Sequence, residues 1–193
     1  MGFKIVHLGD MLDTFSDEEC KEVFANFLCP INSDIEHFLR EKSILLQRMG
    51  LSRTYFVYAP YKGKNVLAGY FAITSKNLTI RKKVSGELRR KITGFKCKEP
   101  SEVPVYLIGQ LAKNYENGYN EVPLITGKEL LWQALKKILE IRHLLGGRVI
   151  LVECNDTQYL RRFYENNGFE FIEQDAEDGL LKYIIKADDI KLI

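Results

Sequence analysis

The amino-acid sequence predicts a single α/β domain spanning residues 1–193, in which helices flank a mixed sheet. β-forming residues on both sides of a glycine-containing turn, within residues 53–74, predict an antiparallel hairpin. A strand, helix and strand pattern at residues 105–152 predicts two parallel strands joined by a right-handed crossover. The 46% hydrophobic content is sufficient for one well-buried core, and the length of 193 residues is short for two domains.

The first quarter of the chain predicts one strand and two helices. Residues 3–8 alternate apolar with polar side chains, which is typical of a strand. A capping box at Ser16–Glu19 predicts a helix that ends before Pro30, and a second box at Ser33–Glu36 predicts one that ends at Gly50. The apolar residues at helical spacing in this second helix are Ile35, Phe38, Leu39, Leu45, Leu46 and Met49.

The rest of the chain alternates strands and helices. The hairpin strands are expected at residues 53–59 and 66–74, around a turn at Lys62–Asn65. Residues 105–112 are almost continuously apolar, which suits a strand buried on both faces. The other strands are expected at residues 149–152, 169–172 and 180–186, and the helices at about 87–91, 128–145 and 158–167.

Composition excludes several classes of protein. No apolar run is long enough to cross a membrane, and the first residues lack the pattern of a signal peptide, so we expect a cytoplasmic protein. No cysteine pair has C-x-x-C spacing and the three histidines are scattered, so we expect no metal site. We interpret the cysteines as small core residues or surface thiols: Cys20, Cys29, Cys97 and Cys154.

The charge is distributed unevenly, although the formal net charge is only +2. Nine lysines and arginines lie between Lys76 and Lys98, against the single acidic residue Glu87. We call residues 76–98 the basic segment. It predicts either a binding surface for an anionic partner or a solvated face, and the sequence leaves both interpretations open.

The start of the long helix is a candidate phosphate site. Thr126, Gly127 and Lys128 follow a buried strand and a loop, where backbone N–H groups and the helix dipole favour an anion. Gly127 would allow close approach of the backbone, and Lys128 would add positive charge. The alternative is a plain helix N-cap, in which Thr126 caps the helix and Gly127 fits the turn.

Three features further along resemble one family. Asn155 follows a buried strand, Phe163 and Tyr164 form an aromatic pair on a helix, and Gly168-Phe169 leads into the next strand. This part of the chain resembles the GNAT N-acetyltransferases. The order of two N-terminal helices, hairpin and long strand agrees with that family, so the resemblance covers nearly the whole chain, with its specific motifs at residues 107–169.

The resemblance implies a GNAT-like twisted sheet whose central parallel strands splay apart, with acetyl-CoA as cofactor. It also implies that Tyr164 is a general acid for the leaving thiolate. No general base stands out in the sequence, since Glu153 lies near a suitable strand end but carboxylates at such positions are usually only solvated. The family's pyrophosphate motif is half kept, because Val122 and Ile125 stand where Gln or Arg and Gly are usual. The implied cofactor-binding residues are Leu111, Lys113, Thr126, Gly127, Lys128, Asn155 and Tyr164.

A second resemblance concerns the substrate. Residues 27–29, 35–39 and 50–55 look like those of the acetyltransferase toxins from bacterial toxin–antitoxin pairs, which acetylate aminoacyl-tRNA. Phosphate contacts from the basic segment fit this substrate. The candidate RNA-binding residues are Arg81, Lys82, Lys83, Arg89, Arg90 and Lys91.

The sequence leaves several alternatives open. The acceptor could instead be a small amine or a protein N-terminus, and the absence of an evident base favours an α-amine, whose pKa is about 8. A non-catalytic module that binds CoA or nucleic acid on the same scaffold is the other hypothesis. The late strand around Tyr183–Ile185 could pair across a homodimer, although pairing within the sheet is the preferred interpretation.

Overall fold

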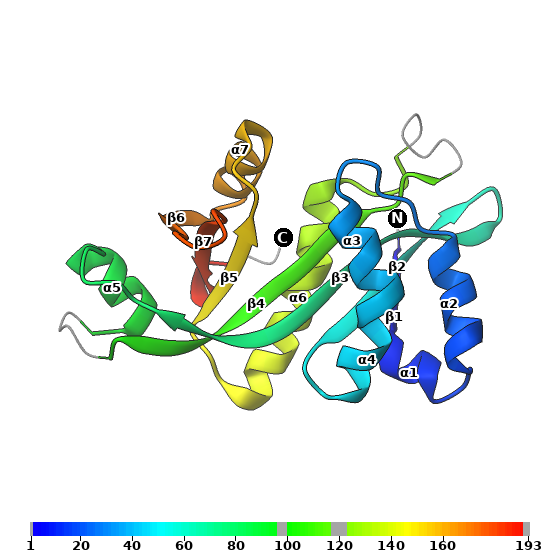
Figure 1. The fold of residues 1–193 in the computed structure, drawn as a ribbon, viewed down its shortest axis with the longest axis horizontal. Coiled ribbons are helices and arrows are strands. Elements are labelled where there is room, and N and C mark those ends of the chain that lie inside the picture. The colour runs from blue at the N-terminus through cyan, green and yellow to red at the C-terminus, as the bar shows by residue number, and fades with distance from the viewer. Residues whose placement is uncertain (1, 96–99, 117–122, 191–193) are drawn as a thin grey trace. The chain divides into compact units, whose positions relative to one another are not determined.

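The computed structural model describes residues 2–95, 100–116 and 123–190 (Figure 1). Lys96, Cys97, Lys98 and Val122, which the sequence analysis names, lie outside the described residues. The chain forms two compact units. Unit 1 comprises residues 1–74 and 109–136, and unit 2 comprises residues 75–108 and 137–193.

Within the described residues, seven strands form one mixed sheet in the order β1-β2-β3-β4-β5-β7-β6. Strands β4 and β5 are parallel, as the crossover pattern predicts, while the pairs β1–β2, β2–β3, β5–β7 and β6–β7 are antiparallel. The strands are β1 (Lys4–His7), β2 (Arg53–Tyr61), β3 (Lys64–Thr79), β4 (Glu102–Lys113), β5 (Val149–Cys154), β6 (Glu170–Gln174) and β7 (Leu181–Lys186).

Unit 1 has helices on both faces of its strands. One face carries a core in which Phe24, Leu39 and Tyr70 are fully buried. Gly69 precedes Tyr70 in β3 and therefore faces the opposite side, where Leu130 of α6 (Gly127–Leu145) approaches it. The helical segments of the first face are α1 (Leu8–Leu12), α2 (Asp17–Ala25), α3 (Ser33–His37), η1 (Phe38–Lys42) and α4 (Ser43–Arg48).

The expected second helix contains a π-helical segment, and this changes its buried face. Each residue turns an α-helix by about 100°, so the wider π turn of η1 rotates every later side chain relative to the simple pattern. Leu45 and Met49, which we expected in the apolar stripe, are 58% and 59% exposed. Ile44 and Gln47 are buried in their place.

One of the two predicted capping boxes is confirmed and the other is wrong. Ser16 and Glu19 form the reciprocal hydrogen bonds that start α2. The N-cap of α3 is Asn32 rather than Ser33, and its side-chain oxygen accepts from the N–H of Asp34. Glu36 does not complete a box, because its carboxylate accepts from the N–H of Cys29 at 2.6 Å.

The hairpin between β2 and β3 has a tighter turn than we expected. Lys62 and Gly63 both have positive φ, 48° and 79°, which is the geometry of a two-residue type I′ turn. The strands consequently continue to Tyr61 and resume at Lys64. The paired length of β2 and β3 makes this hairpin a stable support for β4, the next strand in the sheet.

Unit 2 contains part of this sheet, and α5 (Gly86–Thr93) and α7 (Gln158–Asn166) pack on opposite faces of it. Its core includes Leu88 and Ile92 of α5, packed with Leu151 and Ile184 of the sheet. Tyr183 adjoins Ile184 and so faces the other side, where α7 lies. A short 3₁₀ turn, η3 (Ala187–Asp189), follows β7.

Strand β7 has neighbours on both edges. It pairs with β5 on one side and β6 on the other. Because both edges are already hydrogen-bonded, a homodimer formed by pairing through this strand is excluded. The expectation of pairing within the sheet is therefore confirmed.

Two other expectations concern membranes and cysteines. Over residues 2–95, 100–116 and 123–190, no helix combines the length and apolar character that a membrane crossing requires. Cys20, Cys29 and Cys154 are buried free thiols, in agreement with their interpretation as small core residues.

Candidate functional site

The strand–helix junction after β5 positions the residues that carried the family resemblance. Thr157 caps α7, and its hydroxyl oxygen accepts from the N–H of Leu160 at 3.2 Å. Asp156 and Arg161 form a two-pronged ion pair at 2.7 and 2.8 Å, which ties the junction to the first turn of the helix. The path of the chain from β5 into α7 is therefore well defined locally.

Tyr164 is buried in a cluster of aromatic rings. Its ring centroid lies 5.1 Å from that of Phe163, 5.4 Å from that of Phe169 and 5.9 Å from that of Tyr183. The residue is only 6% exposed. These contacts hold the ring in one orientation, as a group that acts in chemistry requires.

The hydroxyl of Tyr164 has no hydrogen-bond partner within the described part of the chain. The neighbouring Tyr183 differs, because its hydroxyl donates to the carboxylate of Glu165 at 3.1 Å. In the described residues, the fully buried side-chain atoms without a partner are Thr54 Oγ1 and Glu173 Oε2, so the Tyr164 hydroxyl is not one of these enclosed atoms. Burial raises the pKa of Tyr164 well above its usual value, and the nearby Cys154 thiol adds to this effect. Burial also raises the pKa of the Cys154 thiol, to about 11.

Asn155 lies directly after β5, in an exposed position. Its backbone carbonyl accepts from the N–H of Thr157 at 2.9 Å. Its side-chain amide has no partner among the residues that the structure describes. The amide is therefore available to a ligand, as the family resemblance implies.

Glu153 is engaged in an ion pair. Its two carboxylate oxygens lie 2.7 and 2.8 Å from Nζ of Lys76, and its side chain is only 14% exposed. A carboxylate held in this way by a lysine is a poor general base, because protonating it would break the pair. The geometry removes the one weak candidate base that the sequence offered.

In unit 1, Leu111 and Lys113 lie on the edge of β4 that faces away from β3. The N–H of Asn114 donates to the carbonyl of Ala68 in β3 at 2.8 Å. Strand residues alternate between their two edges, so the backbone groups of Leu111 and Lys113 point to the other edge. The parallel pairing of β4 with β5 ends at Ile108, before either residue is reached.

Asn114 fixes the end of β4. Its side-chain oxygen accepts from the N–H groups of Leu28 and Glu116, each at 3.0 Å. Its side-chain amide donates to the carbonyls of Asn26 at 2.8 Å and Leu67 at 3.0 Å. The sequence analysis missed this residue, because three of the four bonds reach residues far away in the sequence.

The start of α6 is a complete capping box. The hydroxyl oxygen of Thr126 accepts from the N–H of Glu129 at 3.1 Å, and the carboxylate of Glu129 accepts from the N–H of Thr126 at 2.8 Å. This agrees with the plain N-cap interpretation. Lys128 is exposed. Ile125, one of the two residues that depart from the pyrophosphate motif, is only 2% exposed and belongs to the core.

Arg89 of the basic segment is inside unit 2 rather than on its surface. It is 5% exposed, and its guanidinium donates to the carbonyls of Ile80, Arg81 and Pro100 at 3.2–3.4 Å. These bonds hold α5 against the chain before and after it. Arg89 therefore supports the fold and does not offer its charge to RNA.

The other candidate RNA-binding residues divide into paired and free groups. Arg81 and Lys83 lie 3.4 and 3.9 Å from the buried carboxylate of Glu173 in β6. Lys91 pairs with Glu170 of the same strand. Lys82 and Arg90 are exposed and have no ion-pair partner in the described residues. The sequence could not predict these ion pairs, because the two β6 carboxylates lie far along the chain from the basic segment.

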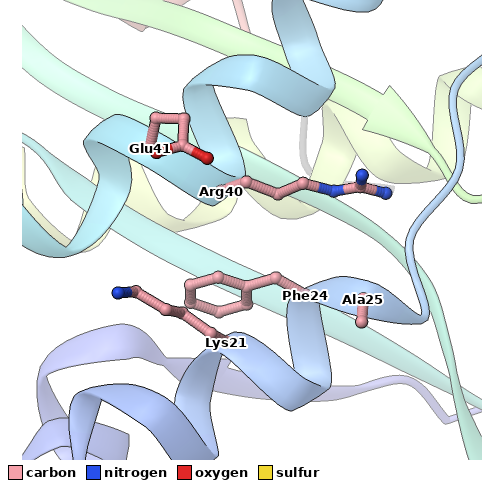
Figure 2. A pocket seen from close by; sticks show the side chains of 5 residues that line it. All are labelled: Lys21, Phe24, Ala25, Arg40 and Glu41. Carbon is pink, nitrogen blue, oxygen red and sulfur yellow. The ribbon is translucent and has the colours of Figure 1, made fainter.

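Two cavities of unit 1 are lined by residues other than the cofactor-binding candidates. One of about 300 Å³ lies between α2 and η1, and Figure 2 shows Lys21 and Phe24 on one side of it with Arg40 and Glu41 on the other. The Arg40 guanidinium already contacts Glu36 at 3.3 Å and the carbonyl of Phe27 at 3.0 Å. The Arg40 guanidinium that borders this cavity is therefore already engaged by other groups of the fold.

Comparison with known proteins identifies solved structures that have this fold. No protein-family model matches the chain, and a search of curated proteins returns no match. Solved structures do match over nearly the whole chain, at 14–16% identity. At this identity the likeness shows the fold alone, which is the GNAT-like mixed α/β fold that the sequence motifs imply.

The similar structures are bacterial toxins. A mutant of KacT in which phenylalanine replaces a tyrosine is 16% identical, covering 97% of this chain and 96% of its own, with a TM-score of 0.64. A similar mutant of AtaT, bound to acetyl-CoA and the C-terminus of the antitoxin AtaR, is 14% identical over 96% and 94%, with a TM-score of 0.61. AtaT complexed with acetyl-methionyl-tRNAfMet is 16% identical over 94% of both chains, with a TM-score of 0.61.

Proposed function

We propose that this protein is an acetyl-CoA-dependent N-acetyltransferase that acetylates the α-amino group of aminoacyl-tRNA. The observation that carries the proposal is the partnerless hydroxyl of Tyr164, held in an aromatic cluster on α7. The similar toxin AtaT has been solved with acetyl-CoA and with acetyl-methionyl-tRNAfMet, an acetyl donor and an acetylated aminoacyl-tRNA. Those ligands support the same donor and the same class of acceptor here.

Tyr164 would donate a proton to the thiolate that leaves. Acetyl-CoA supplies the acetyl thioester that an amine attacks. The phenol of Tyr164 is protonated at neutral pH, because its ordinary pKa of about 10 is already high and burial raises it further. The proton would pass to the sulfur as the carbon–sulfur bond breaks.

Each unit has its own candidate residues for binding acetyl-CoA. In unit 1, backbone groups of Leu111 and Lys113 would hydrogen-bond to the pantetheine arm, and Thr126–Lys128 would contact the pyrophosphate. In unit 2, the candidate is the exposed side-chain amide of Asn155. The capping box does not consume every N–H at the start of α6, so phosphate contacts there need no particular side chain.

The acceptor is an α-amine because Glu153, the candidate base among the described residues, is already paired with Lys76. Because Lys76 holds the Glu153 carboxylate, the attacking amine must lose its proton to water rather than to a general base. An α-amine with a pKa of about 8 is partly neutral at pH 7, whereas a lysine ε-amine with a pKa of about 10.4 is not. Lys82 and Arg90 would contact RNA phosphates directly, and Arg81, Lys83 and Lys91 after exchanging their carboxylate partners.

The decisive experiment measures free thiol and acetyl transfer with charged tRNA, comparing the wild type with Tyr164→Phe. The substitution removes only the hydroxyl, so the fold should persist while kcat falls by about 10²-fold or more. Tyr106→Phe is the matched control. It removes a hydroxyl that donates to the carbonyl of Gly146, elsewhere in unit 2, and should leave kcat within a few fold. Equal rates for Tyr164→Phe and the wild type would remove Tyr164 from the mechanism.

A rival function is a module that binds CoA or nucleic acid without catalysis, and it is favoured by Ile125, which is buried where the family's pyrophosphate motif has a glycine. The same assay separates the two functions. Thermal protection by acetyl-CoA without thiol release, for charged tRNA and for a panel of small amines, would support the binding module and contradict the enzyme.

A further inference from the structure

Helix α7 exposes an aromatic pair that the proposed chemistry does not use. Tyr159 is 69% exposed, although it lies in the first turn of a helix whose buried face is formed around Tyr164. Its ring is nearly parallel to that of Phe163, with an interplanar angle of 12° and a centroid separation of 6.3 Å. Tyr159 therefore presents one flat face to solvent and is steadied on the other by Phe163.

A free cation lies beside this ring. Arg162 follows Tyr159 by three residues, so the two side chains are neighbours on the helix surface. Arg162 is exposed and has no carboxylate or carbonyl partner within the described residues. Its neighbour Arg161 is different, because it is held by Asp156 and lies over the ring of Phe171 at 5.8 Å.

The position of the pair relative to Tyr164 limits what could bind there. Phe163 contacts the ring of Tyr164 directly, and Tyr159 stacks on Phe163. In an aminoacyl-tRNA, the amino acid is esterified to the ribose of the terminal adenosine. When the α-amine reaches the thioester beside Tyr164, that nucleoside must lie only one aminoacyl ester away.

We propose that Tyr159 stacks on the base of the terminal adenosine of aminoacyl-tRNA and that Arg162 contacts an adjacent phosphate. An exposed aromatic face together with a free guanidinium is how proteins bind single-stranded nucleic acid. The inference rests on the proposed function and specifies how the acceptor is held. The adenine of CoA is a poorer fit, because pantetheine and pyrophosphate separate it from the thiol that reacts at Tyr164.

The test compares two acceptors that carry the same α-amine, charged tRNA and an amino-acid methyl ester without a nucleoside. Tyr159→Ala should raise the KM for charged tRNA by about 10-fold or more, the loss expected for one stacked base. The KM for acetyl-CoA and the rate with the methyl ester should stay at the wild-type values. Tyr159→Phe keeps the ring and should behave like the wild type with both acceptors.

Phe15→Ala is the matched control, since it truncates another exposed aromatic residue, 49% exposed and in unit 1. It should change none of these constants. Arg162→Ala should also raise the KM for charged tRNA, and this effect should shrink at high salt because a phosphate contact is screened.

Each unfavourable outcome has a distinct meaning. Normal tRNA kinetics for Tyr159→Ala, in a protein whose wild type acetylates charged tRNA, would overturn this inference and leave the proposed function intact. A raised KM for acetyl-CoA instead would assign the ring to the adenine of CoA. Absence of any acetylation of charged tRNA by the wild type would overturn both proposals.

Discussion

Burial and hydrogen bonding shift the pKa values of individual residues in unit 2 in opposite directions. Burial raises the pKa of Tyr164 and of Cys154, because a charged phenolate or thiolate is poorly solvated there. Asp175 behaves oppositely. The Lys182 ammonium and the backbone N–H of Glu177 hold the pKa of its carboxyl at about 2. The first effect keeps both groups protonated at neutral pH, and the second stabilises the turn between β6 and β7.

The Asp175 carboxylate should stabilise the fold in a pH-dependent way. Its pKa is lower in the folded chain than the usual 3.8, so the stabilisation is complete above that value and is lost as pH falls from about 4 to about 2. Asp175→Asn should therefore lower the denaturant midpoint at pH 7, and the gap to the wild type should narrow across this range. Asp13→Asn, the same change at an exposed position, serves as the control. A gap that does not vary with pH would contradict the role assigned to the carboxylate.

Single elements show how a local pattern and its packing can disagree. The helical spacing around Leu45 and Met49 predicted burial, but the π turn of η1 rotated both residues to the surface. At Gly69, by contrast, packing explains a small residue inside a strand. A Cβ there would lie 2.6 Å from the carbonyl oxygen of Ala112 and 3.3 Å from the side chain of Leu130.

Gly69→Ala should separate β3 from the end of β4. Because the closest atom is backbone, relief requires strand movement, and we expect a loss of about 1–3 kcal/mol in the free energy of unfolding. The KM for acetyl-CoA should also rise, since Leu111 and Lys113 belong to the displaced strand. Gly86→Ala is the control, because nothing lies within 4 Å of a Cβ at that position. Chemical denaturation of both variants makes the comparison, and equal midpoints would contradict the packing argument.

The charge distribution of the whole molecule determines how strongly it should attract the proposed tRNA substrate. The formal net charge is only +2, and much of the basic segment is balanced by carboxylates from β5 and β6. Long-range attraction by the molecule as a whole is therefore modest. Affinity should depend on Lys82 and Arg90, the exposed cations of the basic segment that have no ion pair in the described residues, and on Arg162 beside the aromatic pair.

Binding of charged tRNA should accordingly show a shallow salt dependence. Each phosphate contact contributes about 0.7–0.9 to the slope of log K against log salt, so replacing Lys82 and Arg90 together by alanine should reduce the slope by roughly 1.5. Titrations of labelled tRNA at several KCl concentrations measure this. Alanine at Lys42 and Lys64, two exposed lysines of unit 1, should leave the slope unchanged. An unchanged slope in the first variant would exclude the basic segment from the RNA interface.

Local patterns along the chain were sufficient to predict most elements and the parallel pairing of β4 with β5. They also predicted the helix that carries Tyr164, because strand alternation, helix caps and the F-Y pair depend on residues close in sequence. The partners of charged groups could not be predicted in this way. Lys76 meets Glu153, and Arg89 meets backbone carbonyls, only after distant segments have folded together.

The same reason explains why the sequence indicates the residues of the candidate site but not their surroundings. The family motif indicates that Tyr164 is a candidate catalytic residue. The aromatic rings around Tyr164 and the lack of a partner for its hydroxyl in the described residues are properties of the packed unit. Burial, pairing and pKa depend on atoms from several strands at once. A sequence pattern describes neighbours along one chain segment, whereas desolvation and hydrogen bonding are decided by all segments that reach the same place.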